Sequence, residues 1–166
     1  MGNAAGSETP VVRDAVTDMS SQEKQAVRDT WAAFKKDART SSVAIFVVLF
    51  LKYPAYQRLF LAFSNEPTAE LPRNARAIAH AITVVYAISA IVDTLDEPET
   101  AAELVRKVAN NHVRHTSVSG VQFGHMGQAV VDVLVEKLGH SMSQPAIESW
   151  HRFFAFVVKT SHEVFQ

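Results

Sequence analysis

The sequence contains no cysteine among its 166 residues. This absence excludes disulfide bonds, iron–sulfur clusters, thiolate ligation of a metal and thioether attachment of a cofactor through a Cys-x-x-Cys-His motif. A chain without cysteine also suits a reducing compartment, and we therefore expect a cytoplasmic protein.

Strong charge and long apolar runs are also lacking. The formal net charge is −1, which leaves no electrostatic footprint for nucleic acid or for an anionic membrane. The longest apolar run, near residues 43–51, is far shorter than a membrane span. The N-terminal residues lack the apolar segment of a secretory signal. We therefore expect a globular protein with no nucleic-acid partner.

The first 18 residues are small, polar and weakly patterned. We interpret residues 1–18 as a disordered extension and residues 19–166 as one domain. The chain begins with Met1 and Gly2, as N-myristoylated proteins do, but position 6 carries Gly6 where that motif has Ser or Thr. A second anchoring signal is also missing, so we expect membrane contact only if Gly2 is myristoylated.

Helical periodicity accounts for nearly all of the remaining sequence, and no strand-period segment or repeat occurs. Capping boxes predict helix starts at Ser20 and Ser119. We expect helices over residues 20–38, 43–52, 73–95, 98–114, 119–138 and from 143 onward, with a break at 39–42, a short turn at Pro54 and a loop at 65–72. The sequence thus predicts an all-α domain of seven or eight helices, some of them short.

Two of these helices carry a histidine on an apolar ridge. Leu104, Val108 and His112 follow one another at i, i+4 and i+8, and His80 and Val84 share a face of the long helix over residues 73–95. A buried imidazole must be hydrogen-bonded or bind a metal. A single such histidine is more often a hydrogen-bonded core residue, but two of them indicate a shared apolar surface that both ridges contact.

An ordered set of residues makes the pattern specific. Trp31 lies in the first helix, Pro54 opens the third segment, Phe60 follows six residues later, and His80 and His112 lie on successive long helices. In this order and spacing the sequence resembles the globin family. The resemblance covers roughly residues 20–165 and implies a globin fold of seven to eight helices around a haem pocket.

The resemblance also assigns roles to individual residues. His112 corresponds to the proximal haem ligand and His80 to the distal histidine, which makes both of them candidate metal ligands. The other expected haem-lining residues are Phe46, Phe60, Phe63, Val84, Val108, Val118 and Phe123. We expect the second ring nitrogen of His112 to donate to a backbone carbonyl one turn earlier, near Val108, because such partners orient ligating histidines.

The resemblance implies haem b and the binding of diatomic gases, namely O₂, CO and NO. The two histidines are 32 residues apart, a spacing similar to the neuroglobin, cytoglobin and globin X branches, in which the distal histidine itself binds the iron. Six-coordinate haem would suit sensing or redox chemistry. A five-coordinate oxygen carrier or store is the alternative, and so is nitrite reduction or NO dioxygenation with an external reductase as partner.

Two further alternatives come from other classes. A helical interaction module without haem would show the same periodicity, and in it His80 and His112 could be replaced by leucine. A zinc site at His112 and His115 would need two more ligands. Of the remaining basic groups, His115, Arg114, Arg73 and Arg76 could meet a haem propionate or lie on the surface, whereas His125, His140, His151 and His162 are interpreted as surface or helix-end groups.

Overall fold

The computed structural model describes residues 10–115 and 117–166. In this part of the chain there are six α-helices and three short 3₁₀ segments, and no strand. They are α1 (Ser21–Lys35), α2 (Ala38–Lys52), η1 (Pro54–Leu59), η2 (Thr68–Arg73), α3 (Ala75–Asp93), α4 (Pro98–His112), α5 (Gly120–Leu138), η3 (Gly139–Ser141) and α6 (Gln144–His162). The predicted all-α class is confirmed.

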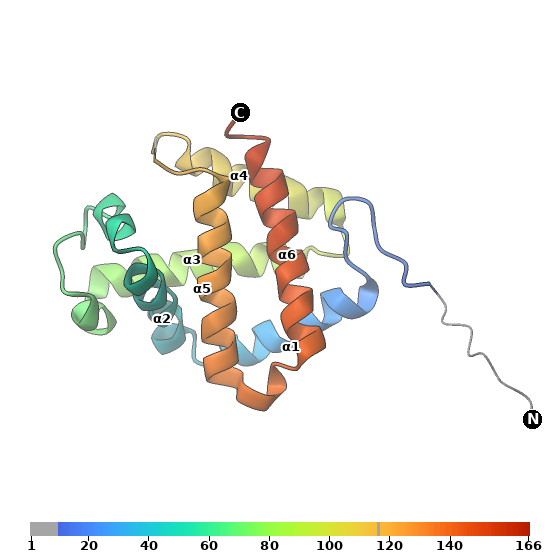
Figure 1. The fold of residues 1–166 in the computed structure, drawn as a ribbon, viewed down its shortest axis with the longest axis horizontal. Coiled ribbons are helices and arrows are strands. Elements are labelled where there is room, and N and C mark those ends of the chain that lie inside the picture. The colour runs from blue at the N-terminus through green and yellow to red at the C-terminus, as the bar shows by residue number, and fades with distance from the viewer. Residues whose placement is uncertain (1–9, 116) are drawn as a thin grey trace, which may run out of the picture.

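The helices form two crossed layers. The last two, α5 and α6, run side by side in opposite directions, and α3 crosses behind them (Figure 1). α2 and the segments η1 and η2 lie at one end of α3, while α1 packs between α3 and α6. The connection from η2 into α3 and the end of α4 therefore border the same side of the molecule.

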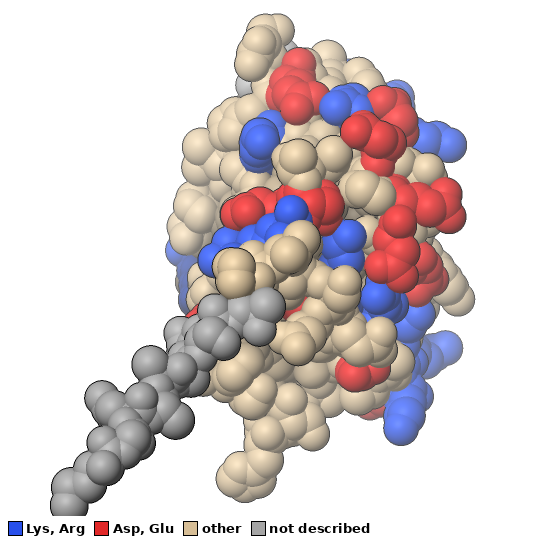
Figure 2. All heavy atoms as spheres, turned by 90° about the vertical axis from the view of Figure 1, so that its right-hand side faces the viewer, with Lys and Arg blue, Asp and Glu red and all other residues tan. Residues whose placement is uncertain are grey.

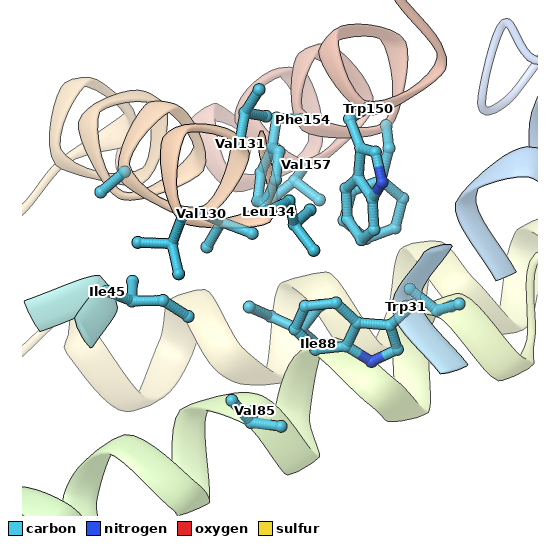
Figure 3. Packing of buried hydrophobic residues seen from close by; sticks show 14 of the residues in the cluster. Trp31, Ile45, Val85, Ile88, Val130, Val131, Leu134, Trp150, Phe154 and Val157 are labelled. Carbon is cyan, nitrogen blue, oxygen red and sulfur yellow. The ribbon is translucent and has the colours of Figure 1, made fainter. Parts of the chain in front are cut away.

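The core joins the first helix to the last. Trp31 of α1 and Trp150 of α6 are fully buried and lie in one apolar cluster (Figure 3). Each indole nitrogen donates a hydrogen bond across the core, from Trp31 to Ser89 Oγ at 2.9 Å and from Trp150 to Thr30 Oγ1 at 2.9 Å. Because a buried indole N–H needs an acceptor, these two bonds fix α1 against both α3 and α6.

Both predicted capping boxes are present. The hydroxyl of Ser20 accepts from the backbone of Glu23, and the Glu23 carboxylate accepts from the Ser20 backbone in return. Ser119 and Gln122 make the corresponding bonds at the start of α5. These helix starts were predictable because a capping box satisfies backbone groups within four residues of sequence.

Two predicted irregular stretches are helical in the structure. The break expected at residues 39–42 is part of α2, which begins at Ala38. Ser41 and Ser42 are buried there, and the Ser42 hydroxyl donates to the Arg39 carbonyl at 3.3 Å. Both serines therefore lie on the inner face of α2. The loop expected at residues 65–72 likewise contains η2.

Helix α3 is strongly apolar on average, although polar residues interrupt its apolar runs. An 18-residue window of this helix has a mean hydropathy of 1.7, so by length and composition alone α3 could cross a membrane. No uninterrupted apolar run reaches the length of a membrane span, but α3 as a whole passes this test of mean hydropathy. A buried core helix of a soluble protein passes the same test, and α3 packs against α1, α2 and α4.

The chain before α1 is fastened by ion pairs. Arg13 binds Glu23 at 2.8 Å, while Arg152 of α6 binds Asp18 at 3.0 Å and Glu23 at 3.1 Å. Figure 2 shows basic and acidic side chains interleaved on this face. The predicted end of the disordered extension, after residue 18, lies inside this packed segment, and residues 1–9 of that extension lie outside the described residues.

Candidate functional site

His112 is the last residue of α4 and is already oriented for ligation. Its Nδ1 lies 2.8 Å from the backbone carbonyl oxygen of Val108, so the predicted hydrogen bond one turn earlier is present. A carbonyl can only accept, and Nδ1 must therefore carry the proton. The neutral ring then has its lone pair on Nε2, the nitrogen that remains for a metal ion.

The ridge that leads to His112 is covered on only one side by protein. Val105 and Ala109 of α4 are buried in the core. Leu104, Val108 and His112 are half-buried on the neighbouring ridge. An apolar ridge that stays half-exposed and ends in an imidazole fits a flat apolar ligand that completes its burial.

Phe123 and Val118 lie on the segment that follows His112. The Phe123 ring, in the first turn of α5, meets the His112 imidazole edge-on, with 5.4 Å between ring centroids and an interplanar angle of 76°. Val118 is half-buried in the connection before α5, and its amide donates to the His115 carbonyl at 2.8 Å. Phe123 therefore borders His112 from the α5 side.

Three phenylalanine rings, here called the phenylalanine cage, pack against one side of His80, which stays exposed on the other. The ring centroids of Phe46, Phe60 and Phe63 lie 5.4, 5.2 and 6.1 Å from that of the imidazole, and Phe46 and Phe60 present an edge-on geometry. Phe46 comes from α2, whereas Phe60 and Phe63 come from the connection between η1 and η2. Val84, one turn after His80 on α3, is half-buried against the core.

The two histidines influence each other electrostatically. Burial lowers the pKa of His80 below its usual value, and a protonated His112 would lower it further. His80 keeps an exposed surface even though apolar rings crowd its other side. Helices α3 and α4 pack against each other, and each carries one of the two imidazoles.

The sequence-based candidates therefore gather into two groups. Phe46, Phe60, Phe63 and His80 form one cluster, while Val108, His112 and Phe123 form the other. Val84 and Val118 lie at the margins of these clusters. This set fits a haem, since it offers one imidazole with a free Nε2, a second imidazole whose pKa is lowered by burial, and apolar or aromatic walls.

The remaining basic residues lie away from these clusters or on the surface. Exposed positions hold His115, Arg114, Arg73, Arg76, His140, His151 and His162. Within residues 10–115 and 117–166, no group of three or more His, Cys, Asp or Glu side chains is placed to hold a metal ion. A zinc site at His112 and His115 therefore finds no further ligands there.

His125 is the exception among the predicted surface histidines. It is half-buried, its ring stacks on Tyr53 with centroids 4.0 Å apart, and its Nδ1 lies 2.7 Å from the Tyr56 hydroxyl. The interpretation as a surface residue is wrong because α5 passes directly beside η1. The sequence carries no signal for this contact, since the bonded residues are 69 positions apart.

Gln57 is a second residue that the sequence analysis missed. Its side chain is 7% exposed and its amide hydrogen-bonds to the backbone of the connection that carries Phe60 and Phe63. A polar residue between the aromatic positions of this corner is the only sequence signal, and it does not reveal the bonding partners.

Comparisons with known proteins agree with this geometry. The Globin family model matches residues 43–161. A globin from Aequiyoldia eightsii is 30% identical over 138 residues, which cover 83% of this chain and 92% of that protein. Cytoglobin-1 from Oryzias latipes is 24% identical over 149 residues, or 89% of this chain and 84% of that protein.

A solved structure shows the same fold. The hexacoordinated haem protein from an anhydrobiotic tardigrade, in a crystal structure at pH 4, matches with a TM-score of 0.84 and 15% identity. The match covers 92% of this chain and 98% of that one. At such low identity the likeness concerns the arrangement of helices.

Proposed function

Because this chain belongs to the globin family, we propose that it binds haem b through His112 and takes up a diatomic gas, O₂, CO or NO, on the side of His80. The observation that carries the proposal is the hydrogen bond from His112 Nδ1 to the Val108 carbonyl at 2.8 Å. That bond leaves Nε2 as the ligating atom and fixes the plane of the ring.

The type of haem follows from the residues that are present. Covalent attachment needs cysteine thiols, and the chain has none. The haem is therefore held by His112 together with apolar contacts from the half-buried ridge of α4 and from Phe123. Non-covalent binding of this kind supports the proposal of haem b.

We further propose that His80 binds the sixth position in the absence of gas. In the haem complex His112 would hold the iron, and His80 would supply the second imidazole. His80 is the imidazole on α3; contacts with Phe46 and Phe60 support one side of its ring, and burial lowers its pKa, which favours the neutral form that binds a metal. The tardigrade protein of the same fold is described as hexacoordinated, and the spacing of 32 residues between the two histidines supports the same state.

In this state an external gas must first displace His80. The apparent affinity for the gas is then reduced by the fraction of protein in which His80 has left. Once displaced, His80 is the side chain that can donate a hydrogen bond to the bound gas, because Phe46 offers no polar group. Such a site suits sensing or redox chemistry with an external reductant, whereas an open sixth position would suit oxygen storage or transport.

The absorption spectrum of the purified protein tests the proposal. It is recorded in the ferric state and after reduction with dithionite under argon, without added ligand. We expect sharp, split visible bands in the reduced wild type. His80→Leu should give one broad visible band, and His112→Ala should lose most of its haem.

An exposed histidine supplies the matched control. His151→Leu makes the same chemical change on the outer face of α6 and should leave the spectrum of the wild type unchanged. A wild type with no Soret band after addition of hemin would contradict haem binding. One broad band in the reduced wild type would instead mean an open sixth position.

A further inference from the structure

Gln57 is a buried amide whose hydrogen bonds reach across an entire loop. Its Nε2 donates to the carbonyl of Phe63 at 2.9 Å and to the carbonyl of Glu66 at 2.7 Å. Its Oε1 accepts from the Thr68 hydroxyl at 3.3 Å. Both amide hydrogens and the amide oxygen are thus used within the connection between η1 and η2.

The other hydrogen bonds of this connection are local. The Phe63 amide donates to the Phe60 carbonyl at 2.9 Å, and the Glu66 amide donates to the Phe63 carbonyl at 3.2 Å. Such bonds define successive turns but do not tie the loop to its surroundings. Gln57 joins the middle of the loop to η1, where it originates, and to Thr68, where η2 begins.

This loop supplies two of the three walls around His80. Phe60 and Phe63 stack on each other with centroids 5.4 Å apart, and both contact the imidazole. The third wall, Phe46, is fixed in the core as a buried residue of α2. Phe63 is likewise buried in the core, whereas Phe60 is half-buried. The wall with room to move is therefore Phe60, which lies on the loop that Gln57 holds.

We propose that Gln57 is a positioning residue that keeps this loop closed around His80 and thereby sets how fast His80 leaves the iron. The inference rests on the proposed function, since it concerns His80 as a haem ligand. Departure of His80 breaks its contacts with Phe60 and Phe63, and the position of Phe60 depends on the loop backbone that Gln57 holds. Removing the amide leaves the loop with local turns alone, which lowers the barrier to that motion.

The test compares two variants that each lose buried hydrogen bonds. Gln57→Met keeps the length of the side chain and removes the amide. Thr30→Val removes the bond from Trp150 and the bond to the Ala26 carbonyl, in the core between α1 and α6. Both changes should lower thermal stability, but only the first lies beside the loop that contacts His80.

The readout is the binding of carbon monoxide to the dithionite-reduced protein in a stopped-flow instrument. At saturating carbon monoxide the observed rate is limited by departure of His80. We expect Gln57→Met to raise this limiting rate about ten-fold, the effect of losing a buried hydrogen bond from the closed state. Thr30→Val should remain close to the wild-type rate.

The outcomes separate this inference from the function on which it rests. A reduced wild type without split bands overturns the six-coordinate state and this inference together. A six-coordinate wild type whose limiting rate is equal in Gln57→Met overturns this inference alone. An equal increase in Thr30→Val also overturns it, because general loss of stability would then explain the effect.

A measurement on the wild type covers the case in which Gln57→Met does not fold. Hydrogen exchange at the amides of Phe63 and Glu66 reports opening of the loop. We expect faster exchange with carbon monoxide bound, when His80 has left its cage, than in the reduced protein without gas. Equal exchange in the two states overturns the inference.

Discussion

At the scale of single residues, Asp14 carries an ion pair that depends on acidity. Burial raises the pKa of this carboxyl, but hydrogen bonds from the Thr17 side chain and backbone and from Lys24, with the charge of Lys24, outweigh burial and lower it to about 2. Lys24 Nζ lies 2.9 Å from the carboxylate and is itself buried. The pair fixes the segment before α1 onto that helix.

Stability should fall in acid because of Asp14. A pKa that is lower in the folded protein than in the unfolded chain stabilises the fold above the ordinary value near 3.8. This contribution is lost as the pH falls from about 4 to about 2. We expect Asp14→Asn to cost about 1 kcal/mol at pH 7, after allowance for solvent screening, in the free energy of urea unfolding.

The difference between Asp14→Asn and the wild type should shrink as the pH approaches 2. Asp93→Asn, at an exposed position at the end of α3, serves as the control and should show no such trend. A difference between Asp14→Asn and the wild type that stays constant from pH 7 to pH 2 would exclude the lowered pKa as its cause.

Individual contacts were predictable from sequence only when helix geometry determines them. The bond from His112 to the Val108 carbonyl spans one helical turn, so its partner follows from the spacing alone. The bonds of Gln57 depend on the path of an irregular loop, and the contact of His125 with Tyr56 depends on how two distant segments dock. No periodicity encodes either arrangement.

At the scale of elements, α5 and α6 approach closely where α5 has glycine. A methyl group at Gly127 would lie 2.5 Å from Cγ of Phe154, nearer than atoms can approach without a shift. A methyl group at Gly124, one turn earlier, would lie 3.6 Å from Val158, an ordinary contact. The lack of a side chain at position 127 therefore sets the distance between the two helices.

Alanine at these two glycines should have opposite effects. Both substitutions gain up to about 1 kcal/mol in helix propensity. Gly127→Ala must also push apart a packed core, which costs about 1–3 kcal/mol. In thermal unfolding we expect Gly127→Ala to be less stable than the wild type and Gly124→Ala to be equal or more stable. Equal stability of the two variants would show that Phe154 moves aside without cost.

Element boundaries were predictable where local bonds set them. The capping boxes of α1 and α5 and the proline at the start of α4 mark helix starts that the structure reproduces. The start of α2 was not predictable, because the burial of Ser41 and Ser42 depends on the core against which α2 packs. Helix α3 shows the same limit, since its composition alone also suits a membrane span.

At the scale of the whole molecule, haem should act as a part of the core. A ligand that binds the folded state and not the unfolded chain stabilises the fold by about 2.7 kcal/mol at a free concentration 100 times its Kd. For a chain of this size that corresponds to a rise in Tm of roughly 5–11 °C. We expect this rise when hemin is added to haem-free protein, measured by circular dichroism.

The rise in Tm should depend on the proximal histidine. His112→Ala, treated in the same way, should gain much less on addition of hemin because the ligating nitrogen is gone. An equal rise in both proteins would point to hemin bound elsewhere on the apolar surface.

The two indole hydrogen bonds of the core constrain the order in which the chain can fold during synthesis. Thr30 receives the bond from Trp150, which lies 120 residues later. A ribosome that adds about 5–20 residues per second needs roughly 6–24 s to make that stretch. Helix α1 is thus synthesised well before α6, and its apolar face stays accessible to chaperones until α6 packs against it. Loss of α6 would therefore remove the packing and hydrogen-bond partner of α1, near the opposite end of the chain.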